Sequence, residues 1–240
     1  MEQIRLDRLL SEAAGIPRAE ARKLILKGFV QVNEEQVRSI DKKVENTVAL
    51  RCKGVLLYHQ QQVYIMLNKP KGVVSARMDG RDKTVVDLVK AEFPRRELFP
   101  AGRLDKDSTG FVLLTDDGIF AHEILAPRHH VSKTYEVVID TVLTPQMIAG
   151  FEAGVCLADG SKMNPADLFA VPGAPNHARV VLHQGVYHQI KRMFGVFDAG
   201  VNELHRSAIG PVALDATLAP GAWRELSAAE VESIRACCQK

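Results

Sequence analysis

The residues best suited to chemistry lie between Ala101 and Gly118, where a charged loop runs into an apolar segment. Asp105 is on that loop, and the β-favouring run Phe111–Thr115 predicts a buried strand a few residues later. Asp116-Asp117-Gly118 then indicates a turn. A carboxylate on a loop that a rigid strand holds in place is well positioned for catalysis. Loop carboxylates are also common on protein surfaces, so this pattern alone favours an ordinary polar loop.

The composition allows two folded domains and excludes a wholly disordered chain. The chain has 240 residues, of which 46% are hydrophobic and 6% aromatic. The net charge of +2 is too small to indicate a nucleic-acid-binding protein by itself. The charge is uneven, because residues 1–59 hold 11 Lys or Arg against 8 Asp or Glu, whereas the remainder holds 20 against 21. The basic excess therefore belongs to the N-terminal quarter.

The cysteines and histidines form no recognisable metal or disulfide pattern. The four cysteines, without a CxxC pair, are Cys52, Cys156, Cys237 and Cys238. Reduced thiols of a cytoplasmic protein are the simplest interpretation. His129 and His130 are adjacent, so their side chains point apart in an extended loop, and a third ligand at a fixed offset is missing. We therefore expect no bound metal ion. No apolar run approaches the ~18 residues that a membrane-spanning helix needs.

The N-terminal quarter predicts two short helices followed by strands. Apolar residues recur with helical spacing over Ile4–Ala14, and Gly15 is a typical helix end. A second helix is expected over Arg18–Lys27, and strands over Phe29–Asn33 and Val48–Leu57. The second helix carries a basic arc, which consists of Arg18, Arg22, Lys23 and Lys27. On charge alone this arc is more typical of a solvated helix face than of a binding surface.

The polar run His59–Gln62 indicates a linker, so we expect one domain over residues 1–59, a linker at 60–63 and a second domain over 64–240. Strands in the second domain are expected over Tyr64–Asn68, Lys133–Asp140, Asp167–Val171, Ala178–His183 and Val201–Arg206. Helices are expected over Thr84–Phe93, Ile119–Leu125 and Pro145–Ala153, within Val186–Val196, and after a capping box of Ser227 and Glu230. Strands mixed irregularly with helices indicate an α+β domain.

Five segments resemble motifs of the RsuA branch of the pseudouridine synthases. Gly102-Arg103-Leu104-Asp105, with Asp107, Gly110 and a strand that ends in Thr-Asp-Asp-Gly, resembles the catalytic motif. The other four follow in the family's order and are Leu67–Gly72, Lys133–Tyr135, Gly185–Phe194, and Leu204–Arg206 with Ile209-Gly210. Together they cover nearly the whole chain. The two N-terminal helices and the strand GFVQVN in turn resemble the S4 RNA-binding domain.

This resemblance implies an α+β protein with a small N-terminal S4 (αL-type) RNA-binding domain and a catalytic domain built on a mixed, mainly antiparallel sheet. It implies isomerisation of a uridine to pseudouridine, in which the bond from ribose C1′ to uracil N1 breaks and the base rejoins through C5. Neither a redox change nor water is involved, so we expect no cofactor. The reaction requires an ionised carboxylate, as a nucleophile or as a base toward the sugar, and the resemblance assigns this role to Asp105.

The resemblance also assigns roles to residues around Asp105. Lys191 matches the family's basic partner of the aspartate, at a position where many relatives carry arginine, and Arg192 is the neighbouring candidate. Tyr135 matches the tyrosine that stacks on uracil and reaches the C5 proton, whereas a lone tyrosine on a strand would be a packing residue. Arg103 matches the arginine that enters the RNA and helps to turn the uridine out of the stack. The expected pocket-lining residues are Lys69 and Ile190, and the expected phosphate-binding residues are Arg18, Arg22, Lys23 and Lys27.

Several functions stay open at this stage. The third motif, Tyr187–Phe194, and the tail from Leu204 to Gly221 resemble the small-subunit branch, which implies one uridine of 16S ribosomal RNA in a partly assembled subunit. The alternative within the family is an enzyme that acts on 23S ribosomal RNA. A non-catalytic S4-domain ribosome-assembly protein would lack part of the carboxylate–tyrosine–basic set, and a glycoside hydrolase would need a second acid at a suitable distance. We expect a cytoplasmic monomer without membrane attachment.

Overall fold

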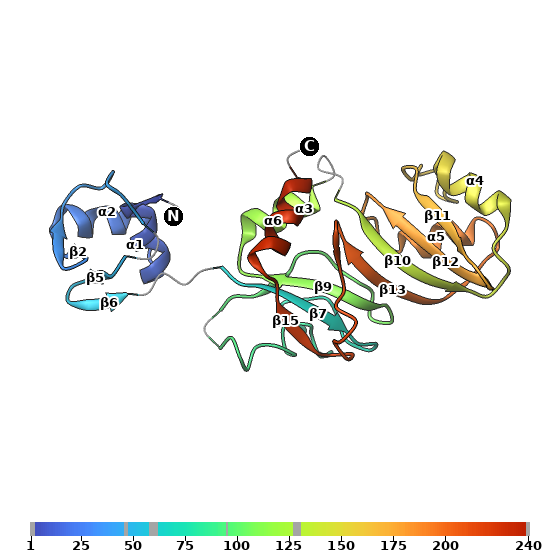
Figure 1. Cartoon of the computed structure of the whole chain (residues 1–240), viewed down its shortest axis with the longest axis horizontal. Helices are drawn as coiled ribbons and strands as arrows, with labels where there is room; N and C mark the ends of the chain where they lie inside the picture. The colour runs from blue at the N-terminus through green and yellow to red at the C-terminus, as the bar shows by residue number, and fades with distance from the viewer. Residues whose placement is uncertain (1–2, 46–47, 58–61, 95, 127–130, 239–240) are drawn as a thin grey trace. The chain divides into compact units, whose positions relative to one another are not determined.

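The computed structural model describes residues 3–45, 48–57, 62–94, 96–126 and 131–238. The chain divides into two compact units, Met1–Gln61 and Gln62–Lys240 (Figure 1). The expected linker lies partly outside the described residues, and His129 and His130 lie wholly outside them.

The N-terminal unit surrounds one apolar core with two helices and short antiparallel strands. Its elements are β1 (Gln3–Arg5), α1 (Leu6–Ala14), α2 (Arg18–Leu26), β2 (Val30–Val32), β3 (Glu35–Val37), β4 (Lys43–Glu45), β5 (Leu50–Cys52) and β6 (Val55–Leu57). β1 pairs with β4, and the other strands form a sheet of order β3-β2-β5-β6. Leu6, Leu9 and Leu10 from α1 meet Ile25 from α2 and Leu50 from β5 in the core.

The first helix begins later than the sequence pattern predicts. Residues 3–5 pair as a strand with Lys43–Glu45, so the expectation that the helix begins at Ile4 is wrong. The helix ends as expected at Gly15, whose φ of 64° is a left-handed conformation that glycine adopts at low cost. The strand expected over Val48–Leu57 is a hairpin of β5 and β6 that turns at Lys53 and Gly54, both with positive φ.

The larger unit is built on one nine-stranded sheet. Its strands are β7 (Tyr64–Lys69), β8 (Phe99–Pro100), β9 (Thr109–Thr115), β10 (Lys133–Ile139), β11 (Asp167–Val171), β12 (Ala174–Leu182), β13 (Val201–Ile209), β14 (Val212–Ala213) and β15 (Trp223–Glu225). The helices are α3 (Gly118–Leu125), α4 (Pro145–Ala153), α5 (Gln189–Gly195) and α6 (Ala228–Cys237). The strand order is β11-β12-β10-β13-β9-β7-β15, with β14 on β13 and β8 on β9. Only the β13–β9 pair is parallel among these described strands, which confirms the α+β class and the mixed, mainly antiparallel sheet.

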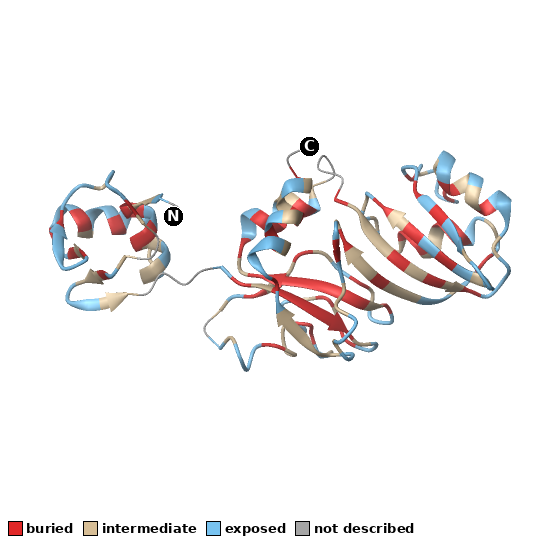
Figure 2. Ribbon diagram, in the orientation of Figure 1, coloured by how far each residue is buried: buried red, intermediate tan, exposed pale blue. Residues whose placement is uncertain are grey.

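The centre of this sheet is buried on both faces. Along β7, successive side chains alternate between two apolar clusters, with Ile65 and Leu67 in one and Met66 in the other. β9 alternates in the same way. Figure 2 shows β7 and β9 buried along most of their length, whereas buried and more exposed residues alternate along β10 and β12. A strand covered on both faces is a rigid support, and β9 is the strand that follows the loop of Asp105.

The helix expected over Thr84–Phe93 is wrong, because this segment is a series of turns. The expected cap hydrogen bond is present, since the Asp87 N–H donates to Thr84 Oγ1 at 3.1 Å. Most backbone bonds that follow span three residues, as from Val89 N–H to Val86 O. Thr84 also forms an isolated bridge with Val74, and β-branched valines lower helix preference. By contrast, the capping box of Ser227 and Glu230 does begin α6.

Gly110 has no room for a larger residue, because it lies where β9 and β13 run parallel and its residue partner is Arg206. Its φ is 101°, and an added Cβ would lie 2.4 Å from Arg206 O and 2.7 Å from Arg206 N. We predict that Gly110→Ala lowers the free energy of unfolding by about 2–5 kcal/mol, from combined backbone strain and overpacking. Urea unfolding followed by the fluorescence of Trp223, which lies in β15 of the same unit, measures this change.

Gly80→Ala is the matched control, because Gly80 has no atom within 4 Å of its added Cβ and no positive φ. Its free energy of unfolding is expected to stay within about 0.5 kcal/mol of wild type. Equal stabilities for the two variants would contradict the close approach of β9 and β13 at Gly110.

Candidate active site

The backbone around Asp105 is fixed by its neighbours on both sides. Asp105 lies on the loop between β8 and β9, after the buried side chain of Leu104. The Ser75 hydroxyl donates to Leu104 O at 2.9 Å, and the Leu104 N–H donates to Ser75 Oγ at 3.0 Å. On the other side, the Ser108 N–H donates to Asp105 O at 3.1 Å. The loop is therefore held in one conformation while the Asp105 side chain stays 27% exposed.

Two basic side chains from the start of α5 contact the Asp105 carboxylate. Lys191 Nζ lies 3.4 Å from Oδ2, and His188 Nε2 lies 3.3 Å from Oδ1. Arg192, the neighbouring candidate, instead forms an ion pair with Asp159 on the surface. The structure thus brings Lys191 to Asp105 and leaves Arg192 away from it.

His188 belongs to the third motif, but the sequence pattern assigned it no role. Its φ of 50° and ψ of 31° are left-handed, which is uncommon for a residue other than glycine. This conformation stacks its ring on Tyr187, with centroids 3.8 Å apart and ring planes at 18°. The only sequence signal was its position three residues before Lys191, at the start of a helix.

Lys69, which the resemblance predicts to line the pocket, is fully buried in the structure. Its side chain is fully buried at the end of β7, and its ammonium donates to three backbone carbonyls. The acceptors are Pro70 O at 3.0 Å, Lys106 O at 3.1 Å and Ser108 O at 2.7 Å. Burial lowers the pKa of Lys69 to about 8, although Asp107 and Asp105 act in the opposite direction. Lys69 therefore holds the loop of Asp105 from beneath.

Ile190 and Tyr135 are also packed in the core of the larger unit. Ile190, the other predicted pocket-lining residue, is 3% exposed and belongs to the larger apolar cluster. Tyr135 is 8% exposed on β10, opposite Val180 of β12 and Arg206 of β13. Its hydroxyl forms no hydrogen bond with any described residue. Arg103 is exposed and likewise takes part in none of the described hydrogen bonds or ion pairs.

A second buried cation, Arg206, lies across the sheet from Lys69. Lys69 is the partner of Gly110 between β7 and β9, and Gly110 is the partner of Arg206 between β9 and β13. Arg206 Nε donates to Phe111 O at 2.6 Å, whereas its Nη2 has no partner among the described residues. Burial, and secondly the charge of Arg206, lower the pKa of Lys133 to about 8. Two buried basic side chains, Lys69 and Arg206, thus lie on either side of Gly110 in the sheet.

The basic arc of the N-terminal unit is organised by one buried carboxylate, Asp7. Arg18, Arg22 and Arg5 all hydrogen-bond to it, with the shortest contact 2.8 Å from Arg22 Nε to Asp7 Oδ2. Burial would raise the pKa of Asp7, but these hydrogen bonds outweigh burial and hold the pKa well below its usual range. Lys23 and Lys27 are exposed and pair with none of the described residues. The arc thus combines anchored arginines with free lysines.

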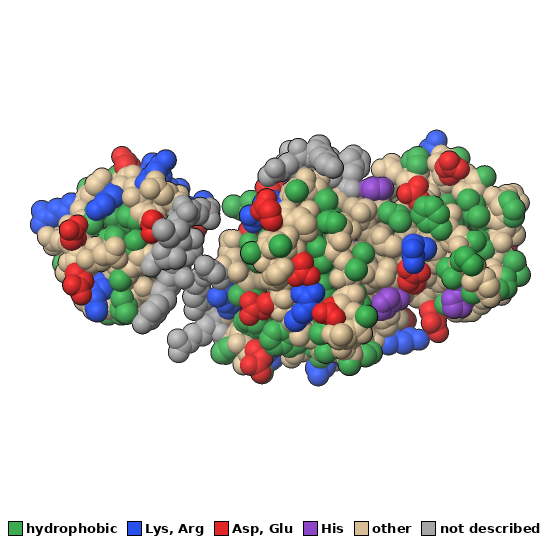
Figure 3. Space-filling view, viewed as in Figure 1, with side chains coloured by type: hydrophobic (Ala, Val, Ile, Leu, Met, Phe, Trp, Pro, Cys, Tyr) green, Lys and Arg blue, Asp and Glu red, His purple; other side chains and the backbone are tan. Residues whose placement is uncertain are grey.

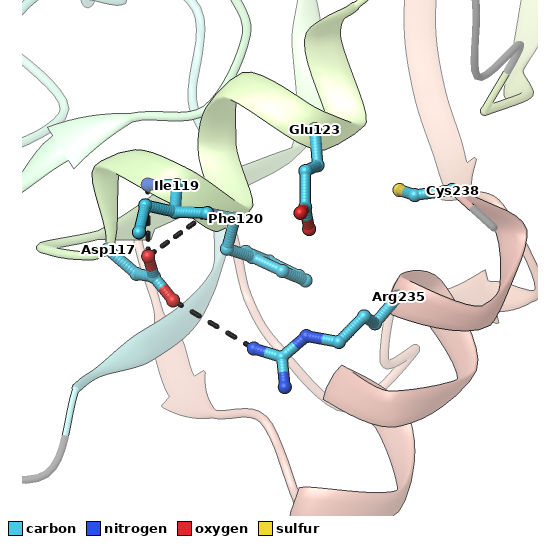
Figure 4. A pocket seen from close by; sticks show the side chains of 6 residues that line it. All are labelled: Asp117, Ile119, Phe120, Glu123, Arg235 and Cys238. Atoms are coloured by element: carbon cyan, nitrogen blue, oxygen red, sulfur yellow. Dashed lines mark hydrogen bonds and ion pairs between the residues drawn. The ribbon is translucent and has the colours of Figure 1, made fainter. Parts of the chain in front are cut away.

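Apart from this site, a small cavity of about 230 Å³ lies between α3 and α6 (Figure 4). Asp117 caps α3 by accepting from the N–H groups of Ile119 and Phe120, and Arg235 of α6 points toward it at 3.9 Å.

The described residues hold no group of three or more His, Cys, Asp or Glu side chains that could bind a metal. None of the described helices is long and apolar enough to cross a membrane. On the visible face of the larger unit, acidic and basic side chains are interspersed (Figure 3).

Comparisons with known proteins agree with this geometry. The family model of RNA pseudouridylate synthases matches residues 63–195, and the S4 domain model matches residues 4–46. Ribosomal small subunit pseudouridine synthase A of Escherichia coli (strain K12) is 38% identical over 234 residues, which are 96% of this chain and 100% of its own length. An uncharacterized RNA pseudouridine synthase of Bacillus subtilis (strain 168), YtzG, is 38% identical over 231 residues, 95% of this chain and 97% of its own. A crystal structure of a pseudouridylate synthase covers 96% of this chain and 99% of its own, with 34% identity and a TM-score of 0.68.

The burial of Lys69 predicts a pH-dependent contribution to stability. The pKa of this lysine is about 8 in the folded chain against an ordinary 10.5. Between these values the unfolded chain keeps a proton that the folded chain has released, so stability rises with pH over this window. We predict that the wild type gains up to about 3 kcal/mol relative to Lys69→Met between pH 8 and 10.5. Urea unfolding at several pH values measures the difference.

Lys71→Met is the control, because Lys71 belongs to the same motif and is exposed. Its stability should change with pH in parallel with the wild type. If the free energy of unfolding of Lys69→Met also changes with pH in parallel with the wild type, the buried position of Lys69 is wrong.

Proposed function

Because this chain belongs to the RNA pseudouridylate synthase family and carries an N-terminal S4 domain, we propose that it isomerises one uridine of 16S ribosomal RNA with Asp105 as the catalytic carboxylate. The observation that supports this most directly is the Asp105 side chain, which contacts Lys191 and His188 and remains partly open to solvent. An accessible, ionised carboxylate is what the reaction requires.

The proposed reaction uses only atoms of the substrate. The bond from C1′ to N1 breaks, the uracil turns, and C5 bonds to C1′. C5 loses its proton and N1 gains one, so no atom is gained or lost overall. Asp105 attacks the sugar or removes a proton from it, and either role needs its negative charge. The protein's own side chains can supply these steps, so we propose that no cofactor takes part.

Lys191 and His188 together replace the single arginine that many relatives use. An arginine can bind both oxygens of a carboxylate at once, whereas a lysine ammonium is a point charge on a flexible stem. In this chain Lys191 contacts one oxygen of Asp105, and His188 contacts the other. The pair therefore supports both the charge and the orientation of the carboxylate.

Tyr135 and Arg103 are proposed to act on the base. The Tyr135 hydroxyl, which has no hydrogen bond within the described structure, would take part in proton transfer at C5 while the ring stacks on the uracil. The ring is nearly buried, so only a base turned out of its stack could reach it. Arg103, exposed two residues before Asp105, is proposed to enter the RNA as the uridine leaves.

The S4 domain is proposed to hold RNA through phosphate contacts. Lys23 and Lys27 supply free charge, and Asp7 keeps Arg18 and Arg22 in fixed positions while nearly half of each arginine side chain stays exposed. Such contacts add affinity without reading sequence. We retain the proposed limits of residues 1–59 for this domain, 60–63 for the linker and 64–240 for the catalytic domain.

The small-subunit target is supported by the relative from Escherichia coli that is named for it and by the third motif of this chain. We propose a cytoplasmic monomer that acts on a partly assembled subunit, because single-stranded or exposed nucleotides in RNA are recognised largely through shape. A hydrolase is disfavoured, since both described charge partners of Asp105 are basic and neither is a second acid. A non-catalytic assembly protein would not need this preserved carboxylate.

We predict that Asp105→Asn abolishes pseudouridine formation while RNA binding stays near wild type. The amide is nearly isosteric with the carboxylate but is neither a nucleophile nor a base. Single-turnover formation of pseudouridine in 16S ribosomal RNA measures the loss, which should exceed about 10³-fold. Asp107→Asn, two residues away on the exposed part of the same loop, is the control and should remain active. Turnover by Asp105→Asn within about tenfold of wild type would exclude Asp105 as the catalytic group.

The target is tested by mapping pseudouridines in both ribosomal RNAs from cells with and without this protein. We predict that one 16S site disappears and that every 23S site remains. With purified protein, a partly assembled small subunit should react faster than bare 16S RNA, because it holds the shape around the uridine. Loss of a 23S site with all 16S sites intact would overturn the target but not the chemistry.

A further inference from the structure

Tyr187 is an aromatic side chain that the fold leaves in water. It is 75% exposed, more than any other aromatic residue in the described part of the chain. Aromatic rings carry much apolar surface and are usually buried for the most part. The fold therefore gains little from this ring, although it lies within the third motif beside His188.

The loop that carries Tyr187 is fixed rather than free. The buried side chain of Gln189 accepts from the Val186 N–H at 3.2 Å and donates to Gln184 Oε1 at 3.3 Å. The Gln189 N–H in turn donates to Val186 O at 3.2 Å. These bonds span Tyr187 and hold its backbone, and the ring itself stacks on His188.

One face of the Tyr187 ring is covered, and the other is open. His188 stacks on it at 3.8 Å between centroids, with ring planes at 18°, and the high exposure of Tyr187 leaves the outer face to solvent. The same His188 contacts Asp105 Oδ1 at 3.3 Å. The covered face of Tyr187 therefore lies against His188, which in turn contacts the proposed catalytic carboxylate of Asp105.

We propose that the open face of Tyr187 is a stacking site for the base of a nucleotide next to the target uridine. Every nucleobase has a π-face, so such a platform binds unpaired RNA with little sequence preference. The uridine at Asp105 and its neighbour are joined by one phosphodiester, and a single side chain, His188, contacts both Asp105 and the Tyr187 ring. This inference rests on the proposed function for the identity of the uridine, but the stacking site itself does not require turnover.

A direct measurement uses a short single-stranded RNA with one uridine flanked on each side by the fluorescent base 2-aminopurine. Stacking on the ring should quench the fluorescence when the full-length protein is added. Tyr187→Leu should lose the quenching and bind about ten- to hundredfold more weakly, whereas Tyr187→Phe and Tyr187→Trp keep a ring and should stay near wild type. Phe169→Leu, at another exposed aromatic residue, is the control and should change nothing.

Kinetics on the small-subunit substrate distinguish two roles of Tyr187. The ring either stacks on a base of the RNA or only holds His188 in position. Loss of a stacking site raises KM for Tyr187→Leu and leaves kcat close to wild type. A fall in kcat with unchanged KM would mean that Tyr187 acts through His188 and would overturn the stacking site. Wild-type affinity and quenching for Tyr187→Leu, or equal losses for Tyr187→Leu and Tyr187→Phe, would overturn it as well. If no ribosomal RNA is modified, the proposed function fails, and the fluorescence measurement still decides on Tyr187.

Discussion

The negative charge of Asp105 is the constraint on which the site depends. A carboxylate drawn partly out of water loses solvation, which disfavours its ionised form unless cations compensate. The start of α5 supplies Lys191, whose ammonium contacts one oxygen, and its N-cap residue His188 contacts the other oxygen through Nε2. Because the two contacts reach different oxygens, they fix the orientation of the carboxylate plane. Helix α5 and its N-cap residue, His188, therefore set the orientation of the Asp105 carboxylate.

The loop beneath that carboxylate is positioned by residues far apart in the sequence. Lys69, Gly110 and Arg206 lie side by side across β7, β9 and β13. A buried cation is costly unless its donors are satisfied, and the ammonium of Lys69 meets three carbonyls in and beside the loop. Glycine between the two cations lets the strands approach closely, so the loop has little freedom. A rigid loop would hold the proposed catalytic group, Asp105, without a cost at the moment of reaction.

The sequence predicted more of the fold than of the site. The α+β class and the capping box of α6 follow from local patterns that tertiary contacts reinforce, whereas the mixed sheet was predicted from the family resemblance. The cap at Thr84 was equally visible, but the segment that follows forms turns against Val74, a contact that no local pattern shows. Motif order led to the pair of Asp105 with Lys191. It could not reveal His188, whose contact depends on a left-handed backbone, or the burial of Lys69, which depends on carbonyls more than 35 residues along the chain.

The net charge describes the N-terminal unit poorly. Some of its charged side chains are buried or paired, and others are exposed where an RNA could contact them. Asp7 is buried and neutralises part of the charge of Arg5, Arg18 and Arg22. The same contacts already restrict the rotamers of these arginines, so the arginines lose less conformational entropy when they bind RNA. Anchored arginines thus offer less charge but smaller entropic losses, whereas Lys23 and Lys27 offer full charge on flexible stems. Phosphate contacts of the first kind would fix the register of an RNA strand, and those of the second kind would mainly add salt-dependent attraction.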